Sequence, residues 1–174
     1  MAATTDTSGP GTAVPRARLL LKEVAWRHQA GEMRPEDLPM AAAEALAAGM
    51  DDPALTELAG MPRNADPRDI RDAFEQALSD VGITPPDRGQ AQRYALRALA
   101  ERFVAGQAPL AELASADWWE TQVESAEERA FVALIPPCTC CLAYTLGLDE
   151  QEWETRLRSA ALALAARPAV GPGS

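Results

Sequence analysis

Residues 67–82 read PRDIRDAFEQALSDVG, and this stretch decides the fold class. Its apolar side chains recur at the i, i+3, i+4, i+7 spacing of one helix face, as Ile70, Ala73, Phe74, Ala77, Leu78 and Val81. Asp66 supplies an N-cap acceptor, and Pro67 suits the first helical position because an N–H there would have no helical partner. The stretch therefore predicts an amphipathic helix that ends at Gly82.

The same period recurs at both ends of the chain. A first helix is predicted from the stripe Ala17, Leu20, Leu21, Val24, Ala25 and His28. A last helix is predicted from the stripe Trp153, Leu157, Ala160, Ala161 and Leu164. Shorter stripes lie within residues 38–46, 55–58 and 96–103. Residues 131–135, FVALI, are apolar on every side, which predicts a central helix that breaks at Pro136.

Residues that begin and end helices punctuate the whole chain. Asp52 before Pro53 repeats the helix-starting pattern of Asp66 before Pro67, with an N-cap acceptor followed by Pro at the first helical position. Two pairs have the spacing of a capping box, namely Ser125 with Glu128 and Asp149 with Glu152. Six glycines close periodic stretches, where a left-handed residue suits a helix C-terminus: Gly31, Gly49, Gly60, Gly82, Gly106 and Gly147. Together these patterns predict about eight helices.

Composition and length point to one helical domain. Alanine supplies 36 of the 174 residues, whereas β-branched and aromatic residues are sparse, so local preference is helical. We expect an all-α fold, a compact multi-helix bundle over residues 15–166. Residues 1–14 and 167–174 are expected to be disordered tails, because they lack an apolar period. Subdivision is plausible only at residues 82–87, and one core is expected to span them.

The charge balance limits the classes of partner. Sixteen basic and 26 acidic residues give a net charge of −10, and no long basic tract is present, which argues against nucleic-acid binding. Neither a membrane-spanning run nor a signal pattern is present, so a cytoplasmic protein is expected. The acids are concentrated, with 11 against three Arg in residues 36–80. Such a surface favours a basic protein or peptide as partner.

Three segments of the chain resemble uncharacterised small, Ala-rich helical proteins of actinobacteria. They are MRPEDLPMAAAEALAAGMDDPALTELAG at 33–60, DAFEQALSDVGI at 72–83 and ALRALAERFVAGQAPLAELASADWW at 95–119. The resemblance covers about residues 33–120. It implies a helical fold and no particular activity.

Adjacent tryptophans mark a candidate binding surface. Trp118 and Trp119 point about 100° apart on a helix, so both cannot bury against the same neighbour. An exposed indole among acids has the character of an interaction anchor, and the acids concerned are Asp117, Glu120 and Glu124. The alternative is that both indoles pack between helices as core residues.

A cysteine cluster supports a second hypothesis. Cys138, Cys140 and Cys141 follow Pro137, so Cys138 would lie in a first helical turn, which favours its thiolate. Such a cluster suits redox chemistry or a soft metal, Zn or Cu(I), and His28 would complete a four-ligand set only if its helix packs nearby. Simple packing of small apolar cysteines is the alternative.

The sequence contains no nucleophile-elbow, phosphate-loop or HExxH motif, and no carboxylate pair placed for acid and base catalysis. No catalytic residue or cofactor is therefore predicted, and oligomeric state stays open. The leading interpretation is a non-enzymatic binding or adaptor protein with an acidic, aromatic surface, for which an inhibitor or immunity-type role also fits. The thiol site is the alternative.

Overall fold

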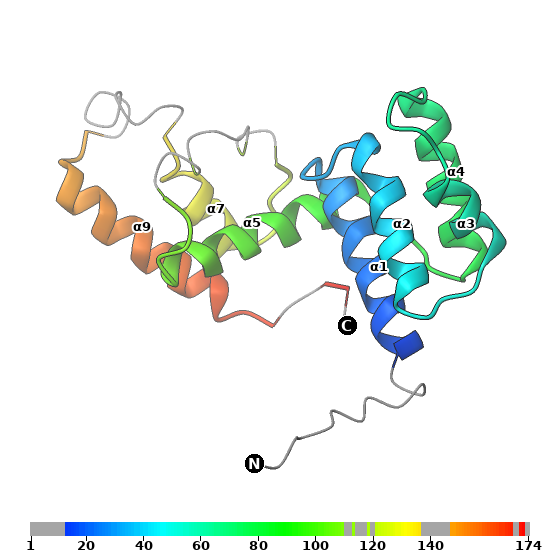
Figure 1. The fold of residues 1–174 in the computed structure, drawn as a ribbon. Helices are drawn as coiled ribbons and strands as arrows, with labels where there is room; N and C mark the ends of the chain where they lie inside the picture. The colour runs from blue at the N-terminus through cyan, green and yellow to red at the C-terminus, as the bar shows by residue number, and fades with distance from the viewer. Residues whose placement is uncertain are drawn as a thin grey trace, which may run out of the picture. The chain divides into compact units, whose positions relative to one another are not determined.

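The computed structural model describes residues 13–109, 113, 118, 121–136, 147–168 and 171–172. Within these residues the chain forms seven α-helices, one short 3-10 helix and no strand (Figure 1). The predicted all-α class is confirmed, with one α-helix fewer in the described residues than the eight or so expected. None of the helices in these ranges is both long enough and apolar enough to span a membrane.

Contacts divide the chain into two compact units. Unit 1 spans Met1–Pro86 with Gly171–Ser174, and unit 2 spans Asp87–Val170. The boundary between the units lies between Pro86 and Asp87, within residues 82–87, the one place where the sequence makes a subdivision plausible. Unit 1 contains α1 (Ala13–Ala30), η1 (Pro35–Asp37), α2 (Leu38–Ala47), α3 (Pro53–Ala59) and α4 (Pro67–Asp80). Unit 2 contains α5 (Arg88–Val104), α7 (Ala126–Val132) and α9 (Glu150–Ala165). The predicted single domain over residues 15–166 stays a prediction.

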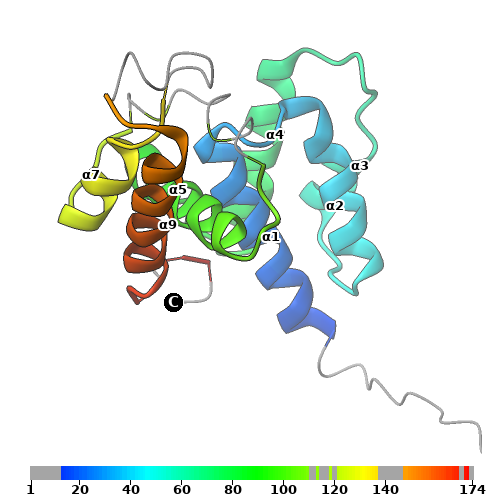
Figure 2. The same cartoon turned by 90° about the vertical axis from the view of Figure 1, so that its left-hand side faces the viewer.

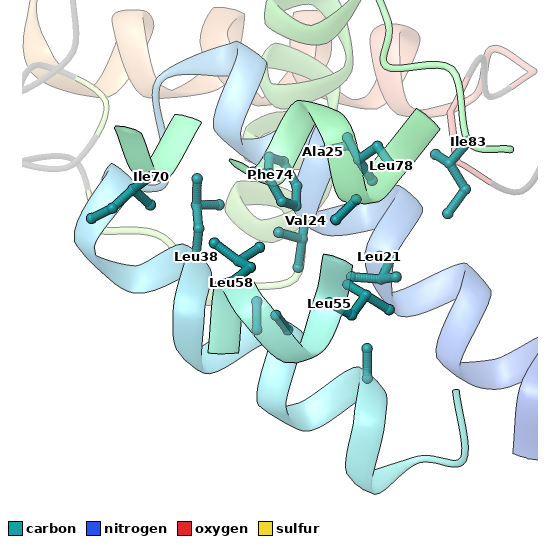
Figure 3. Packing of buried hydrophobic residues seen from close by; sticks show 14 residues of the cluster. Leu21, Val24, Ala25, Leu38, Leu55, Leu58, Ile70, Phe74, Leu78 and Ile83 are labelled. Atoms are coloured by element: carbon teal, nitrogen blue, oxygen red, sulfur yellow. The ribbon is translucent and has the colours of Figure 1, made fainter. Parts of the chain in front are cut away.

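The core of unit 1 forms around the predicted stripe of α4. Phe74 and Leu78 point from α4 toward Val24 and Ala25 of α1 (Figure 3). Side chains of α2 and α3 complete the cluster, which includes Leu38, Leu55 and Leu58. Because α2 contacts both α1 and α3, one face of α2 is buried and the opposite face is left at the surface.

A side chain of α1 holds the C-terminal end of α4. Gly82 adopts a φ of 65°, the left-handed conformation predicted for it, and Ile83 N–H bonds the Leu78 carbonyl. Arg18 donates hydrogen bonds to the carbonyl oxygens of Val81 and Gly82, the latter at 2.7 Å. A cation at a helix C-terminus also complements the helix dipole, so this contact fixes α1 against α4.

The core of unit 2 centres on a buried indole. Trp153 of α9 is 0% exposed, and its Nε1 donates a 2.7 Å hydrogen bond to the Leu134 carbonyl oxygen. Phe131 of α7 and Leu99 of α5 are buried in the same cluster. Helices α5 and α9 lie side by side in both views (Figures 1 and 2), which agrees with their extensive contacts.

Two local predictions are corrected by the structure. The apolar segment 131–135 is not a continuous helix, because α7 ends at Val132 and Ala133 is exposed in the following turn. Ile135 precedes Pro136, which disfavours helical geometry at Ile135 and provides no N–H to continue the ladder. Gly60 has a φ of −81°, so it ends α3 in an ordinary right-handed conformation.

The predicted caps at Asp52, Asp66 and Ser125 are confirmed. Ser125 Oγ accepts from Glu128 N–H at 3.1 Å, and Glu128 Oε2 accepts from Ser125 N–H at 2.9 Å, which is a complete capping box. Asp149 accepts from Glu152 N–H.

Replacing Ser125 with alanine is expected to destabilise the fold by about 1 kcal/mol, because the Glu128 N–H in the first turn of α7 loses its side-chain acceptor. Urea denaturation measures this loss of unfolding free energy. Ser79→Ala, which changes an exposed serine within α4, is the control and should shift the free energy by less than about 0.5 kcal/mol. Equal effects of the two variants would contradict the role of the cap.

Candidate protein-binding surfaces

A groove of about 490 Å³ opens on the surface of unit 1, between α1 and α2. We call it the methionine-lined groove. Its apolar lining is Leu20, Val24, Met33, Pro39, Met40, Ala41, Ala43, Ala59 and Met61. Its charged lining is Glu23, Arg27, Glu36, Asp37, Glu44 and Arg63. The groove therefore combines an apolar floor with an excess of carboxylates.

Helix periodicity places several of these side chains along two stripes, one on α1 and one that runs from η1 along α2. On α1, Leu20, Val24 and Arg27 follow the i, i+4, i+7 spacing of one face. Asp37, Met40 and Glu44 follow the same kind of spacing from the end of η1 along α2. The opposite face of α2 is buried in the unit 1 core. The stripe that contains Met40 and Glu44 is therefore free to contact solvent or a partner.

The three methionines differ in exposure. Met33 and Met61 are partly buried and pack against the unit 1 core, whereas Met40 is 55% exposed. Met40 therefore offers apolar surface between two acidic residues of the groove lining, Asp37 and Glu44. Methionine is unbranched and polarisable, so it adapts to the shape of an incoming side chain.

Four carboxylates line this groove against two guanidinium groups, those of Arg27 and Arg63. Glu23, Glu36, Asp37 and Glu44 make no ion pair with any of the residues that the structure describes. Arg27 on the same wall lies 3.8 Å from Glu32, which is outside the lining. Unpaired carboxylates beside apolar surface attract a cationic partner, and they repel an anionic one.

The structure locates two members of the predicted tryptophan surface. Trp118 is partly exposed and packs against the unit 2 core, and its buried Nε1 has no acceptor among the described residues. Glu124 is exposed, and its Oε1 lies 2.9 Å from Arg93 Nη1. The remaining members, Asp117, Trp119 and Glu120, lie outside the described residues. The exposed tryptophan anchor stays a prediction.

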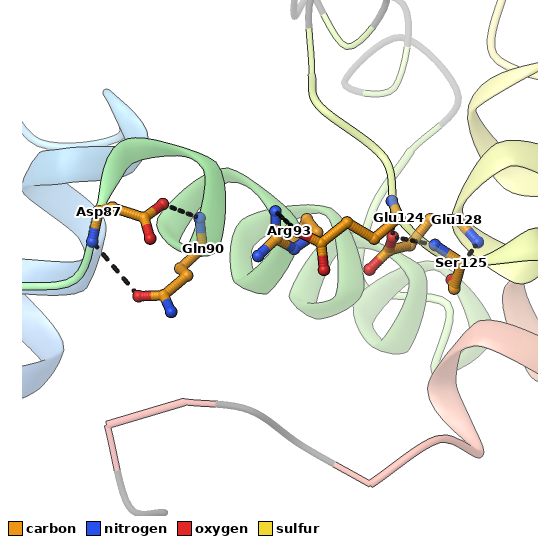
Figure 4. Close-up of polar contacts among 6 residues, drawn as sticks. All are labelled: Asp87, Gln90, Arg93, Glu124, Ser125 and Glu128. Atoms are coloured by element: carbon orange, nitrogen blue, oxygen red, sulfur yellow. Dashed lines mark hydrogen bonds and ion pairs between the residues drawn. The ribbon is translucent and has the colours of Figure 1, made fainter.

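Glu124 belongs to a polar network in unit 2, part of which Figure 4 shows. The network borders a second hollow, of about 470 Å³. The Glu124 backbone N–H donates to Glu128 Oε2 at 2.8 Å. Arg97 donates to Glu101 Oε1 at 2.9 Å and to the Ala165 carbonyl at 3.0 Å, which links α5 to the end of α9. These arginines already have partners within unit 2, so the network is best explained as a structural one.

Arg167 also lines this hollow. Its Nη1 lies 2.5 Å from Glu127 Oε2 and forms an ion pair with it. The pKa of Glu127 lies below its ordinary value, because its carboxylate accepts a hydrogen bond from its own backbone N–H and another from Arg167. A lowered folded-state pKa stabilises the fold above the unfolded-state pKa. That contribution is lost as pH falls through the folded-state pKa.

His28 is partly buried and contacts the edge of the unit 1 core. Its Nδ1 lies 3.2 Å from the Met33 carbonyl oxygen, which can only accept, so Nδ1 carries the proton. Its ring meets Phe74 edge to face, with centroids 5.8 Å apart. Cys138, Cys140 and Cys141 lie outside the described residues, so the zinc or copper alternative stays a prediction. Within the described ranges, no three His, Cys, Asp or Glu side chains converge.

Sequence reasoning did not identify the methionine-lined groove. The pattern that could have indicated it is Asp37, Met40 and Glu44, an apolar residue flanked by acids on the outer stripe of a helix. Comparison with protein-family models, with curated proteins and with solved structures gives no match to this chain. The geometry of the methionine-lined groove is therefore the main indication of function in this chain.

Proposed function

We propose that the chain is a non-enzymatic binding protein whose partner is a basic protein or peptide. The observation that carries this proposal is the set of unpaired carboxylates around an apolar groove in unit 1. The net charge of −10 supports it, because the long-range field attracts cationic partners and accelerates their association. Apolar contact would then supply affinity once the partner is docked.

A labelled peptide of leucine and lysine, about 14 residues long so that a helix can form, is a direct probe of this function. Fluorescence anisotropy is expected to show saturable binding to the whole chain. Raising the salt from about 0.05 M to about 0.5 M should weaken binding several-fold, because it screens exposed charges. The same peptide with glutamate in place of lysine is the control and should not bind. Absence of lysine-peptide binding, or equal binding of both peptides, would contradict the proposal.

A further inference from the structure

We propose that the methionine-lined groove seats one amphipathic helix of the basic partner. Its apolar side chains would lie between α1 and α2, and its Lys or Arg side chains would meet the carboxylates of Asp37 and Glu44. This inference rests on the proposed function and deepens it, because it assigns both the place and the conformation of the partner.

Asp37, the last residue of η1 and the N-cap residue of α2, and Glu44 of α2 flank Met40 along one stripe of the groove lining. Seven residues of helix rise about 10 Å, so the two carboxylates bracket an apolar site two turns long. A partner helix with cations at i and i+7 repeats this spacing, and its positions i+3 and i+4 then face the methionine. In this one alignment of the partner helix, its cations meet the two carboxylates and its apolar side chains meet Met40.

The α1 side of the groove offers the same combination of apolar and acidic side chains. Leu20 and Val24 of α1 form its apolar part, and Glu23 adds a further carboxylate on that side. Met33 and Met61 lie in the floor and are anchored in the unit 1 core. A helix laid along the groove would contact both walls, which is the usual way a groove binds an amphipathic helix. The flexible methionines let several different apolar side chains fit.

Charge also favours an external basic helix over two other possible occupants, a second copy of this chain and another segment of the same chain. A second copy of the chain carries a net charge of −10, so mutual repulsion disfavours it. The parts of this chain outside the described residues contain no Lys and no Arg, so they offer no basic side chain to pair with the carboxylates. An external basic segment satisfies both the apolar and the charged parts of the groove.

The apolar part of the proposal is tested with Met40→Ser in the full chain. Binding of the leucine–lysine peptide is expected to weaken about tenfold, the loss typical of a central interface contact. Leu162→Ser is the matched control, because Leu162 is 51% exposed but lies on α9 of unit 2. The control should bind within about twofold of the unchanged chain, since scattered surface apolar residues contribute little. Equal affinity of the two variants would overturn the proposed site.

The charged part is tested by two triple variants that alter net charge equally. The groove variant is Glu23→Gln, Glu36→Gln and Glu44→Gln, and the control variant is Glu57→Gln, Asp72→Asn and Glu75→Gln. All six residues are exposed in unit 1, and only the first three line the groove. We expect the groove variant to bind about tenfold more weakly and the control to change about twofold. Equal losses would show a general field effect and overturn the site.

The helical conformation is tested by a scrambled peptide with the same composition but no apolar face. It should bind about tenfold more weakly than the amphipathic peptide, because its leucines cannot all reach the groove. Far-ultraviolet circular dichroism of each variant confirms that the helices are retained. If both peptides bind equally and the groove variants have no effect, the basic-partner function stands and this inference fails. If neither peptide binds, both fail.

Discussion

Replacing Trp153 with alanine is expected to lower the free energy of unfolding by about 3–5 kcal/mol. The indole is fully buried in unit 2 among Phe131, Leu99 and Leu157, so truncation removes apolar contact and leaves a cavity. The Leu134 carbonyl also loses the hydrogen bond from Nε1. Urea denaturation followed by far-ultraviolet circular dichroism measures the change.

A smaller substitution at position 153 separates the contribution of apolar packing from that of the Nε1 hydrogen bond. Trp153→Phe keeps an aromatic ring but no N–H donor, so its cost should be smaller, about 1–3 kcal/mol. Leu162→Ala on the exposed side of α9 is the control and should stay within about 0.5 kcal/mol. A loss below about 1 kcal/mol for Trp153→Ala would contradict the central position of this indole.

Phe74→Ala is expected to have a comparable effect on unit 1, about 3–5 kcal/mol. Phe74 is 2% exposed, and it lies at the centre of the cluster that α1, α2, α3 and α4 form (Figure 3). The substitution also removes the edge-to-face contact with His28. Chemical denaturation again measures the loss of unfolding free energy.

The matched control for this position is Glu75→Gln, which changes the next residue of α4 on its exposed face. It should alter stability by less than about 0.5 kcal/mol. Phe74→Leu retains most of the apolar volume and should fall between the two variants. The unit 1 core would be misassigned if Phe74→Ala and Glu75→Gln were equally stable.

Much of the fold follows from local physics that the sequence displays. The stripe at Ile70, Phe74 and Leu78 predicts both the helix and its buried face, and α4 is confirmed at Pro67–Asp80. Asp66 and Ser125 act as caps because the backbone donors beside them have no other partner. These features depend only on neighbours in the chain, which is why they could be predicted.

Other features depend on contacts between distant residues and could not be predicted. The methionine-lined groove exists only because α1 and α2 pack together, which brings Leu20 and Met40 into one lining. The hydrogen bonds of Arg18 to the end of α4 join residues more than 60 positions apart. The early end of α7 reflects competition between an apolar run and the backbone restriction before Pro136. Sequence periodicity alone does not decide such competitions.

The most direct test of the central claim is chemical-shift mapping on the isotope-labelled full chain, titrated with the leucine–lysine peptide. We expect saturable shift changes in residues 20–27 of α1 and 36–44 of η1 and α2, the walls of the methionine-lined groove. Residues of α5 and α9 should stay unchanged. Saturable changes centred on Trp118 and Glu124 instead, or none anywhere, would contradict the claim that a basic helix binds between α1 and α2.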